Sequence, residues 1–190
     1  MSPKDVAPYN MGTALPLLLV AFTLGSSAYM YKLKGPIWFT WHPISMIASF
    51  VLLAALAILI KKAGGYTNTK IHMYLMVCAV VLAGFGWYVI YSNKEMYGKP
   101  HVVTLHAQLG VGVCLGYVGL ALFGGLALNP DWGFLKTDKR MRFLHKWSGR
   151  VFTALAWVCC CYGFATLEAR LEYQLAFAVP LVFFSVFVLM

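Results

Sequence analysis

The chain has 190 residues, of which 61% are hydrophobic and only 11% are charged, and its formal net charge at pH 7 is +9. Soluble domains carry about 25% charged residues, so this composition excludes an ordinary soluble protein and indicates an integral membrane protein. The positive charge does not indicate nucleic-acid binding, because the lysines and arginines are confined to segments beside the apolar stretches.

Six apolar stretches follow one another along the chain, and each is close to the roughly 20 residues that cross a bilayer. We predict an all-α membrane protein with a single domain, 1–190, and a central four-helix bundle. The expected transmembrane helices are 14–31, 42–60, 72–91, 106–128, 145–167 and 173–190. Because the connections are short, consecutive helices should be antiparallel neighbours. A cleavable signal peptide is the alternative for the first stretch, but its length favours a transmembrane helix.

The basic residues divide unequally between the two ends of this bundle. One end carries ten of them: Lys4, Lys61, Lys62, Lys70, Lys136, Lys139, Arg140, Arg142, Lys146 and Arg150. The other end carries five: Lys32, Lys34, Lys94, Lys99 and Arg170. Cytosolic loops are enriched in Lys and Arg, so the first end and both termini are predicted to be cytosolic. The sequence does not distinguish an endomembrane from the plasma membrane.

Four of the five histidines open the four central stretches: His42, His72, His106 and His145. Alternate helices of an antiparallel bundle begin at the same face, so His42 and His106 share the non-cytosolic level. His72 and His145 then share the cytosolic level. Pairs across the levels are about 27 Å apart, because eighteen helical residues separate them. We therefore predict two non-covalent haem b groups, each ligated by two histidines.

Other metal centres fit the sequence less well. A zinc site would recruit carboxylates or thiolates, but all six acidic residues lie in tails, loops or helix ends. The five cysteines fall inside predicted helices and form no Cys-x-x-Cys-His motif, which argues against covalent haem. The third and fourth stretches contain many glycines, which allow close approach of either a flat macrocycle or a neighbouring helix. They are Gly84, Gly86, Gly110, Gly112, Gly116, Gly119, Gly124 and Gly125.

Four motifs resemble those of the cytochrome b561 family. They are Trp41-His42-Pro43, Lys70-Ile71-His72, the run from Lys99 to His106, and the run from Leu144 to Arg150. The resemblance covers nearly the whole chain, and the short tails are most similar to the small members described as ferric-chelate reductases. It implies a dihaem reductase that moves single electrons across a membrane. The implied donor is cytosolic ascorbate, and the implied acceptor is a ferric chelate or monodehydroascorbate.

Basic residues near the two cytosolic histidines would attract an anionic donor, which the resemblance identifies as ascorbate. The candidates are Lys70, Lys139, Arg140 and Arg142. Two positions depart from the family pattern. Tyr66 replaces a lysine of members that use ascorbate well, and Lys139 replaces an arginine. These changes predict weaker ascorbate binding or a different reductant.

His101 is the one histidine that the two irons do not need. By resemblance it belongs to the non-cytosolic substrate site, where an imidazole would hydrogen-bond the acceptor, ligate a ferric chelate or relay a proton. Tyr97 and Lys99 are its expected neighbours in that site.

Two other functions are compatible with intramembrane histidines. A histidine-lined metal or proton transporter would place acidic residues at the membrane midplane, and the sequence has none there. A dihaem anchor subunit of a larger redox complex would need partner subunits for activity. The sequence leaves open whether the chain is a monomer or a homodimer.

Overall fold

The computed structural model describes residues 14–190, and over that range the chain is helical and contains no strand. The membrane-spanning helices are α1 (Ala14–Lys34), α4 (Tyr66–Met96), α5 (Leu105–Leu126), α6 (Lys139–Leu167), α7 (Leu171–Val188) and a composite second span, 38–62. That second span joins η1 (Trp38–Thr40), α2 (Trp41–Ile47), η2 (Ala48–Leu53) and α3 (Ala54–Lys62). All six are long and apolar enough to cross a bilayer. The predicted all-α fold with six membrane helices is confirmed, and the protein is a multi-pass membrane protein.

Two helix starts differ from the sequence prediction by more than a turn. Helices α4 and α6 each begin six residues before His72 and His145, so these histidines lie inside the helices rather than at their starts. The Asp138 carboxylate caps α6 by accepting bonds from two backbone N–H groups, and α4 follows the left-handed glycine pair Gly64 and Gly65. The Asp138 cap sets the start of α6 and the glycine turn sets the start of α4, whereas the prediction followed hydropathy. Lys4, used in the orientation argument, lies outside the described residues.

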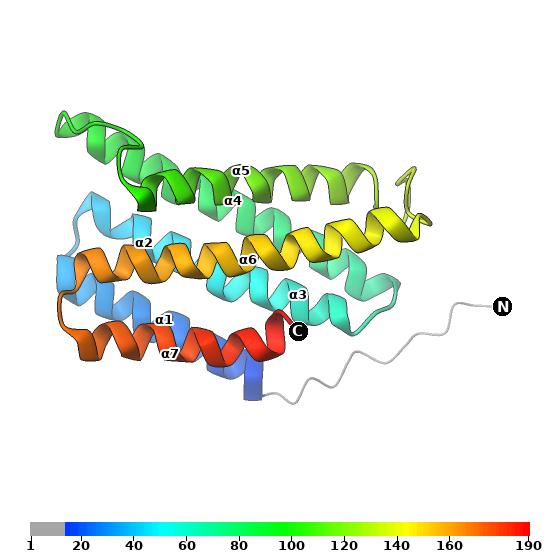
Figure 1. The fold of residues 1–190 in the computed structure, drawn as a ribbon, viewed down its shortest axis with the longest axis horizontal. Coiled ribbons are helices and arrows are strands. Elements are labelled where there is room, and N and C mark those ends of the chain that lie inside the picture. The colour runs from blue at the N-terminus through cyan, green and yellow to red at the C-terminus, as the bar shows by residue number, and fades with distance from the viewer. Residues whose placement is uncertain (1–13) are drawn as a thin grey trace.

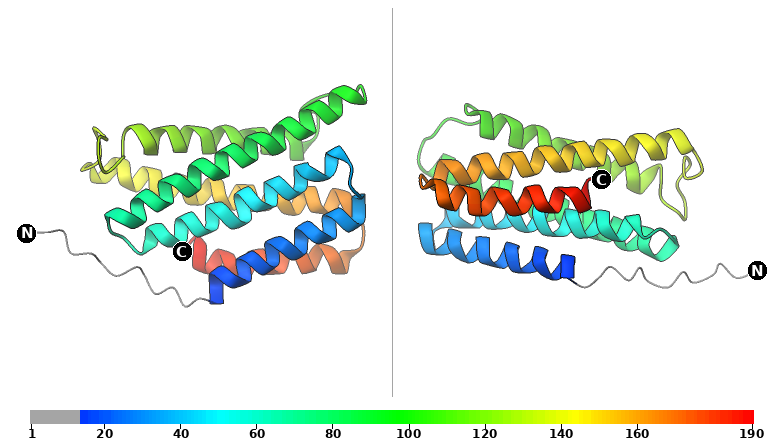
Figure 2. Two further views of the ribbon diagram at one scale, coloured as in Figure 1. Left: turned by 180° about the vertical axis from the view of Figure 1, so that it is seen from behind. Right: turned by 60° about the horizontal axis from the view of Figure 1, so that its bottom comes forward.

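The four central spans form the bundle, and α1 and α7 lie side by side against one flank (Figure 1). The turned views in Figure 2 show the same arrangement. Phe22 of α1 joins the flank by packing its ring 5.4 Å from Phe177 and 5.7 Å from Phe184, both on α7. One end of the bundle contains the α3–α4 turn and the α5–α6 loop. We call it the basic face, and the other end the opposite face.

The outer surface of the bundle is apolar, as a membrane environment requires. Val81, Leu115 and Val182 are 67%, 67% and 68% exposed. The interior contains small residues, and Ala54 and Ala57 are completely buried. Membrane helices gain little from hydrophobic burial against each other, so close backbone contact through such residues stabilises the bundle.

The second span is not a regular α-helix. At η2 the chain forms a π turn, in which the Ala54 N–H bonds to the Ser49 carbonyl five residues earlier. The Phe50 carbonyl instead accepts a 2.9 Å hydrogen bond from the indole N–H of Trp157 on α6. The Ser49 hydroxyl donates to the Ala79 carbonyl of α4 at 2.7 Å. Neighbouring helices therefore hold the π turn in place.

A buried carboxylate ties α1 to the α6–α7 connection at the opposite face. Glu168 is 4% exposed and accepts hydrogen bonds from the Arg170 guanidinium and the Tyr29 hydroxyl. The guanidinium, with smaller help from the hydroxyl, holds the pKa of Glu168 well below its usual range. Gln174 of α7 donates to the Glu168 carbonyl at 2.7 Å, so the short connection is fixed on both sides.

Candidate haem-binding and substrate sites

His42 and His106 face each other near the opposite face of the bundle. Their ring centroids are 6.3 Å apart, and the rings are nearly perpendicular at 82°. An imidazole nitrogen binds a first-row metal at about 2 Å, so two imidazoles on opposite sides of one ion have centroids about 6 Å apart. The spacing of this pair fits one iron.

Hydrogen bonds fix the ring orientation of two of the four histidines. Nδ1 of His42 lies 2.9 Å from the Gly86 carbonyl, and Nδ1 of His72 lies 2.9 Å from the Ala57 carbonyl. A carbonyl only accepts, so each Nδ1 must carry the hydrogen, which leaves the Nε2 lone pair free. Metal-ligating histidines use their second nitrogen in this way.

The other two histidines have different surroundings. Nδ1 of His106 lies 3.4 Å from the Cys159 thiol. Nδ1 of His145 is buried and has no hydrogen-bond partner within residues 14–190. No group of three or more His, Cys, Asp or Glu side chains gathers as a possible bare-metal site in the same range. The His42–His106 pair lies in an apolar bundle and fits a haem, whose macrocycle would supply the remaining ligands.

Small residues make room for the histidine rings. A Cβ atom added to Gly163 would lie 2.6 Å from Cε1 of His106, and one added to Gly124 would lie 2.9 Å from Cε1 of His145. Real Cβ contacts are essentially never this short. A side chain at either position would therefore push the imidazole out of place.

The four contacts form a reciprocal pattern. Each central span carries a histidine near one end. Near its other end it carries a backbone position that lies against the histidine of a neighbouring span. The pairs on single spans are His42 with Ala57, His72 with Gly86, His106 with Gly124, and His145 with Gly163. They are 14 to 18 residues apart, which corresponds to about 21–27 Å of helix. The two histidine levels therefore lie near opposite ends of one bundle.

Sequence reasoning found Gly86 and Gly124 as sites of close approach but missed Gly163 and Ala57. A signal for Gly163 was available, because it follows His145 by the same 18 residues that separate Gly124 from His106. Ala57 has no such signal, since its contact with His72 is made by the backbone carbonyl.

Replacing Gly163 by alanine should displace the His106 ring and weaken haem binding at that level. Overpacking of this kind costs about 1–3 kcal/mol, so most of one haem component should be lost during purification. The absorption spectrum and the haem content per chain measure this. Gly112→Ala is the matched control, because a Cβ there meets nothing within 4 Å. Full haem content in Gly163→Ala would contradict the proposed crowding.

The histidine-bearing spans match a known family. The sequence model described as eukaryotic cytochrome b561 matches residues 41–169, which is more than half of the chain and includes all four histidines of the central spans. The chain belongs to the cytochrome b561 family. Membership implies haem b as the bound cofactor.

Three cytochrome b561 relatives show the range of similarity. The human transmembrane reductase CYB561D2 is 29% identical over 74% of this chain and 66% of its own length. The rat plasma membrane ascorbate-dependent reductase CYBRD1 is 23% identical over 60% and 42%. The maize ascorbate-specific transmembrane electron transporter 2 is 29% identical over 51% and 46%. The chain thus spans from about two fifths to about two thirds of the length of these relatives, which are named as reductases or as an electron transporter.

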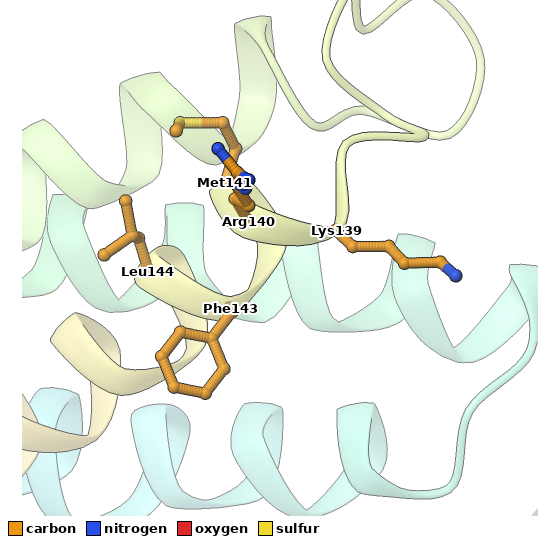
Figure 3. Close-up of a pocket in the computed structure, with 5 residues that line it drawn as sticks. All are labelled: Lys139, Arg140, Met141, Phe143 and Leu144. Carbon is orange, nitrogen blue, oxygen red and sulfur yellow. The ribbon is translucent and has the colours of Figure 1, made fainter.

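The candidate donor-binding cations on the basic face are not equivalent. Lys139 and Arg140 lie on the first turn of α6 and line an open hollow together with Met141, Phe143 and Leu144. Figure 3 shows the five side chains fanning out around this turn, with Lys139 pointing away from Leu144. Arg142 lies on the same turn but is not among the lining residues.

Lys70, in contrast, is already paired. Its ammonium lies 2.9 Å from the Asp131 carboxylate in the α5–α6 loop, and the Tyr66 hydroxyl donates to the same carboxylate. These hydrogen bonds, from Tyr66 first and Lys70 second, hold the pKa of Asp131 below its usual value. Sequence reasoning did not single out Asp131, because 61 residues separate it from Lys70.

His101 is held firmly although it lies in a loop. Its Nε2 is 2.6 Å from the Glu95 carboxylate, and its ring stacks on Tyr91 with centroids 4.6 Å apart. The next residue, Val102, has a left-handed φ of 53°, which is unusual for a β-branched residue and often marks a functional site.

The expected neighbours of His101 are arranged differently. The Lys99 ammonium lies 5.7 Å from the centroid of the Tyr97 ring, so these two side chains pair with each other. The side chains in contact with His101 are Glu95 and Tyr91, and sequence reasoning named neither as a site residue.

Proposed function

We propose that this protein is a single-domain dihaem oxidoreductase that passes single electrons across the membrane from ascorbate to a ferric chelate or monodehydroascorbate. The basic face would be cytosolic, with both termini, and would receive the donor. The observation that carries the proposal is the pair of histidine levels at opposite ends of one bundle. A protein with a redox centre near each membrane surface is suited to moving electrons between them.

His42 and His106 would hold one haem b, and His72 and His145 the other. When bound, the haems supply reversible one-electron chemistry at both levels. The chain contributes binding and orientation. The Gly86 and Ala57 carbonyls keep the Nε2 lone pairs free, and the small residues opposite the rings leave them room.

The donor side is proposed from charge. Lys139, Arg140 and Arg142 lie together at the start of α6, within six residues of His145. Asp138, the nearest carboxylate in the sequence, is occupied in capping the helix. The cluster would therefore attract an anion such as ascorbate, which two of the three relatives carry in their names.

The acceptor side is proposed around His101. The Glu95 carboxylate fixes Nε2 of this imidazole, so the ring is oriented to act on an acceptor at the opposite face. Lys99 and Tyr97, on the same loop, would contact the outer part of the acceptor. Glu95 acts as a positioning residue in this proposal, because it reaches the acceptor only through His101.

The test is electron transfer across a sealed membrane. The purified chain should contain two haems b by pyridine haemochrome analysis. In proteoliposomes, ascorbate on the basic face should reduce a ferric chelate trapped on the other side. Liposomes with a His72→Ala variant provide the control, since they retain a multi-pass protein but interrupt the path. One haem per chain, or no reduction of the trapped chelate, would refute the proposal.

A further inference from the structure

The α5–α6 loop is a compact unit with a fixed shape. The Leu135 N–H bonds to the Ala127 carbonyl at 2.8 Å, and the Gly133 N–H bonds to the Asn129 carbonyl at 2.9 Å. The Gly133 backbone is so close to the start of the loop that a Cβ there would lie 2.5 to 2.6 Å from backbone atoms of Asn129 and Ala127. The loop therefore presents its side chains in defined positions.

This loop docks on the first turns of α4, next to His72. The buried Asn129 side chain contacts the Met73 sulfur at 3.2 Å, and its oxygen accepts from the Asp131 N–H at 2.9 Å. This bond places the Asp131 carboxylate over Lys70 and Tyr66. The loop thus delivers a negative charge to the turn of α4 that precedes a proposed haem ligand.

Two donors converge on Asp131. The Lys70 ammonium and the Tyr66 hydroxyl are 3.2 Å apart, and they donate to different oxygens of the carboxylate. Lys70 and Asp131 are 31% and 32% exposed, so a small solute can reach them. Among the described residues, this is the only salt bridge on the basic face, and the α6 cations form none.

We propose that Asp131 is a built-in competitor for the anionic electron donor. Its carboxylate occupies the Lys70 ammonium and the Tyr66 hydroxyl, and two oxygens of a donor enediolate take the same groups when they displace it. Tyr66 is then a donor-binding residue, although it replaces a lysine of other family members. This inference rests on the proposed function, because it assumes that an anion such as ascorbate reduces the protein at this face.

The competition predicts a change in donor affinity and not in the maximal rate. Asp131→Asn should lower the ascorbate concentration for half-maximal haem reduction about two- to fivefold, the range expected for an exposed ion pair. The limiting rate should stay the same, because no residue that holds a haem is altered. The difference should shrink at high salt, where screening weakens both the pair and the attraction of the donor.

The experiment is stopped-flow reduction of the holoprotein at varied ascorbate concentration. Asp138→Asn is the matched control, because it removes the same charge from the same loop, while asparagine still caps α6 and Asp138 does not contact Lys70. Asp138→Asn should change the half-saturating ascorbate concentration less than Asp131→Asn does. An uncharged dihydroquinone should reduce all variants equally.

A double substitution sharpens the test. Lys70→Ala should raise the half-saturating concentration more in the Asp131→Asn background than in the unmodified chain, because only there is the ammonium free. The proposal that Asp131 competes with the donor would be wrong if Lys70→Ala raised the half-saturating ascorbate concentration equally in both backgrounds. It would also be wrong if Asp131→Asn and Asp138→Asn lowered that concentration equally. If the dihydroquinone reduces the holoprotein and ascorbate does not, ascorbate is not the donor. The proposed competition by Asp131 is then refuted as well.

Discussion

Alanine at His42 or at His106 should remove the same haem and leave the other in place. The two ring centroids are 6.3 Å apart, so both imidazoles would hold the same haem, and either substitution takes one of them away. Alanine at His72 or His145 should remove the second haem. Each variant should therefore contain about one haem per chain, and optical redox titration should show the loss of one of two components.

His101→Ala is the control for these four variants, because it removes a histidine that lies outside both pairs. It should retain two haems. The grouping of the spectra is decisive: if His42→Ala and His72→Ala lost the same component, the assignment of the histidines to levels would be wrong. Loss of both haems in all four variants would show that the chain does not hold either haem without the other.

His101→Ala should slow delivery of electrons to the acceptor and leave the donor step unchanged. Monodehydroascorbate takes up a proton with its electron, and a positioned imidazole contributes about 10²-fold or more to such a transfer. A ferric chelate needs the electron alone, so its reduction should slow less. Stopped-flow reduction by ascorbate and re-oxidation by each acceptor separate the two steps.

Glu95→Gln tests the positioning role within the same experiment. The amide keeps the size of the side chain but loses the carboxylate that lies 2.6 Å from Nε2 of His101. Its defect should lie between those of the unmodified chain and His101→Ala, and Glu95→Asp should recover part of the rate. Tyr97→Phe keeps the ring that contacts Lys99 and loses only the hydroxyl, so it should slow the acceptor step less than Glu95→Gln does. A His101→Ala variant that is slow only with ascorbate would contradict the acceptor role.

The six membrane spans and the proximity of His42 to His106 could be predicted from the sequence, because both follow from periodicity and length. A span must be about 20 apolar residues long, and alternate antiparallel helices return to the same level. Those two rules bring His42 and His106 together, although 64 residues separate them. The helix starts were less accessible, because the caps at Asp138 and Gly65 lie in polar segments that hydropathy alone passes over.

The contacts around the proposed donor and acceptor residues could not be predicted from the sequence. The pairing of Lys70 with Asp131 depends on the folded shape of a loop 61 residues away. The contact between Glu95 and His101 depends on a tight loop in which Gly98 has a left-handed φ of 59°. The glycine predicts a turn, but it does not show which side chain that turn brings to the imidazole. Such contacts arise from tertiary structure, and propensity or spacing does not encode them.

The π turn at η2 determines where the second span can change in length. A π turn accommodates one more residue than an α-helical turn, so deleting one residue from Ala48–Leu53 would restore a regular helix. Six residues of π-helix turn through nearly the same angle as roughly five of α-helix, so the part of the span beyond this deletion would keep its angle about the helix axis. The Ala57 carbonyl would then still lie towards His72. A deletion in the regular α turns on either side would instead rotate everything beyond it by about 100°. Ala48–Leu53 is therefore a place where the second span can lose a residue and keep the angular register between the two ends of the bundle.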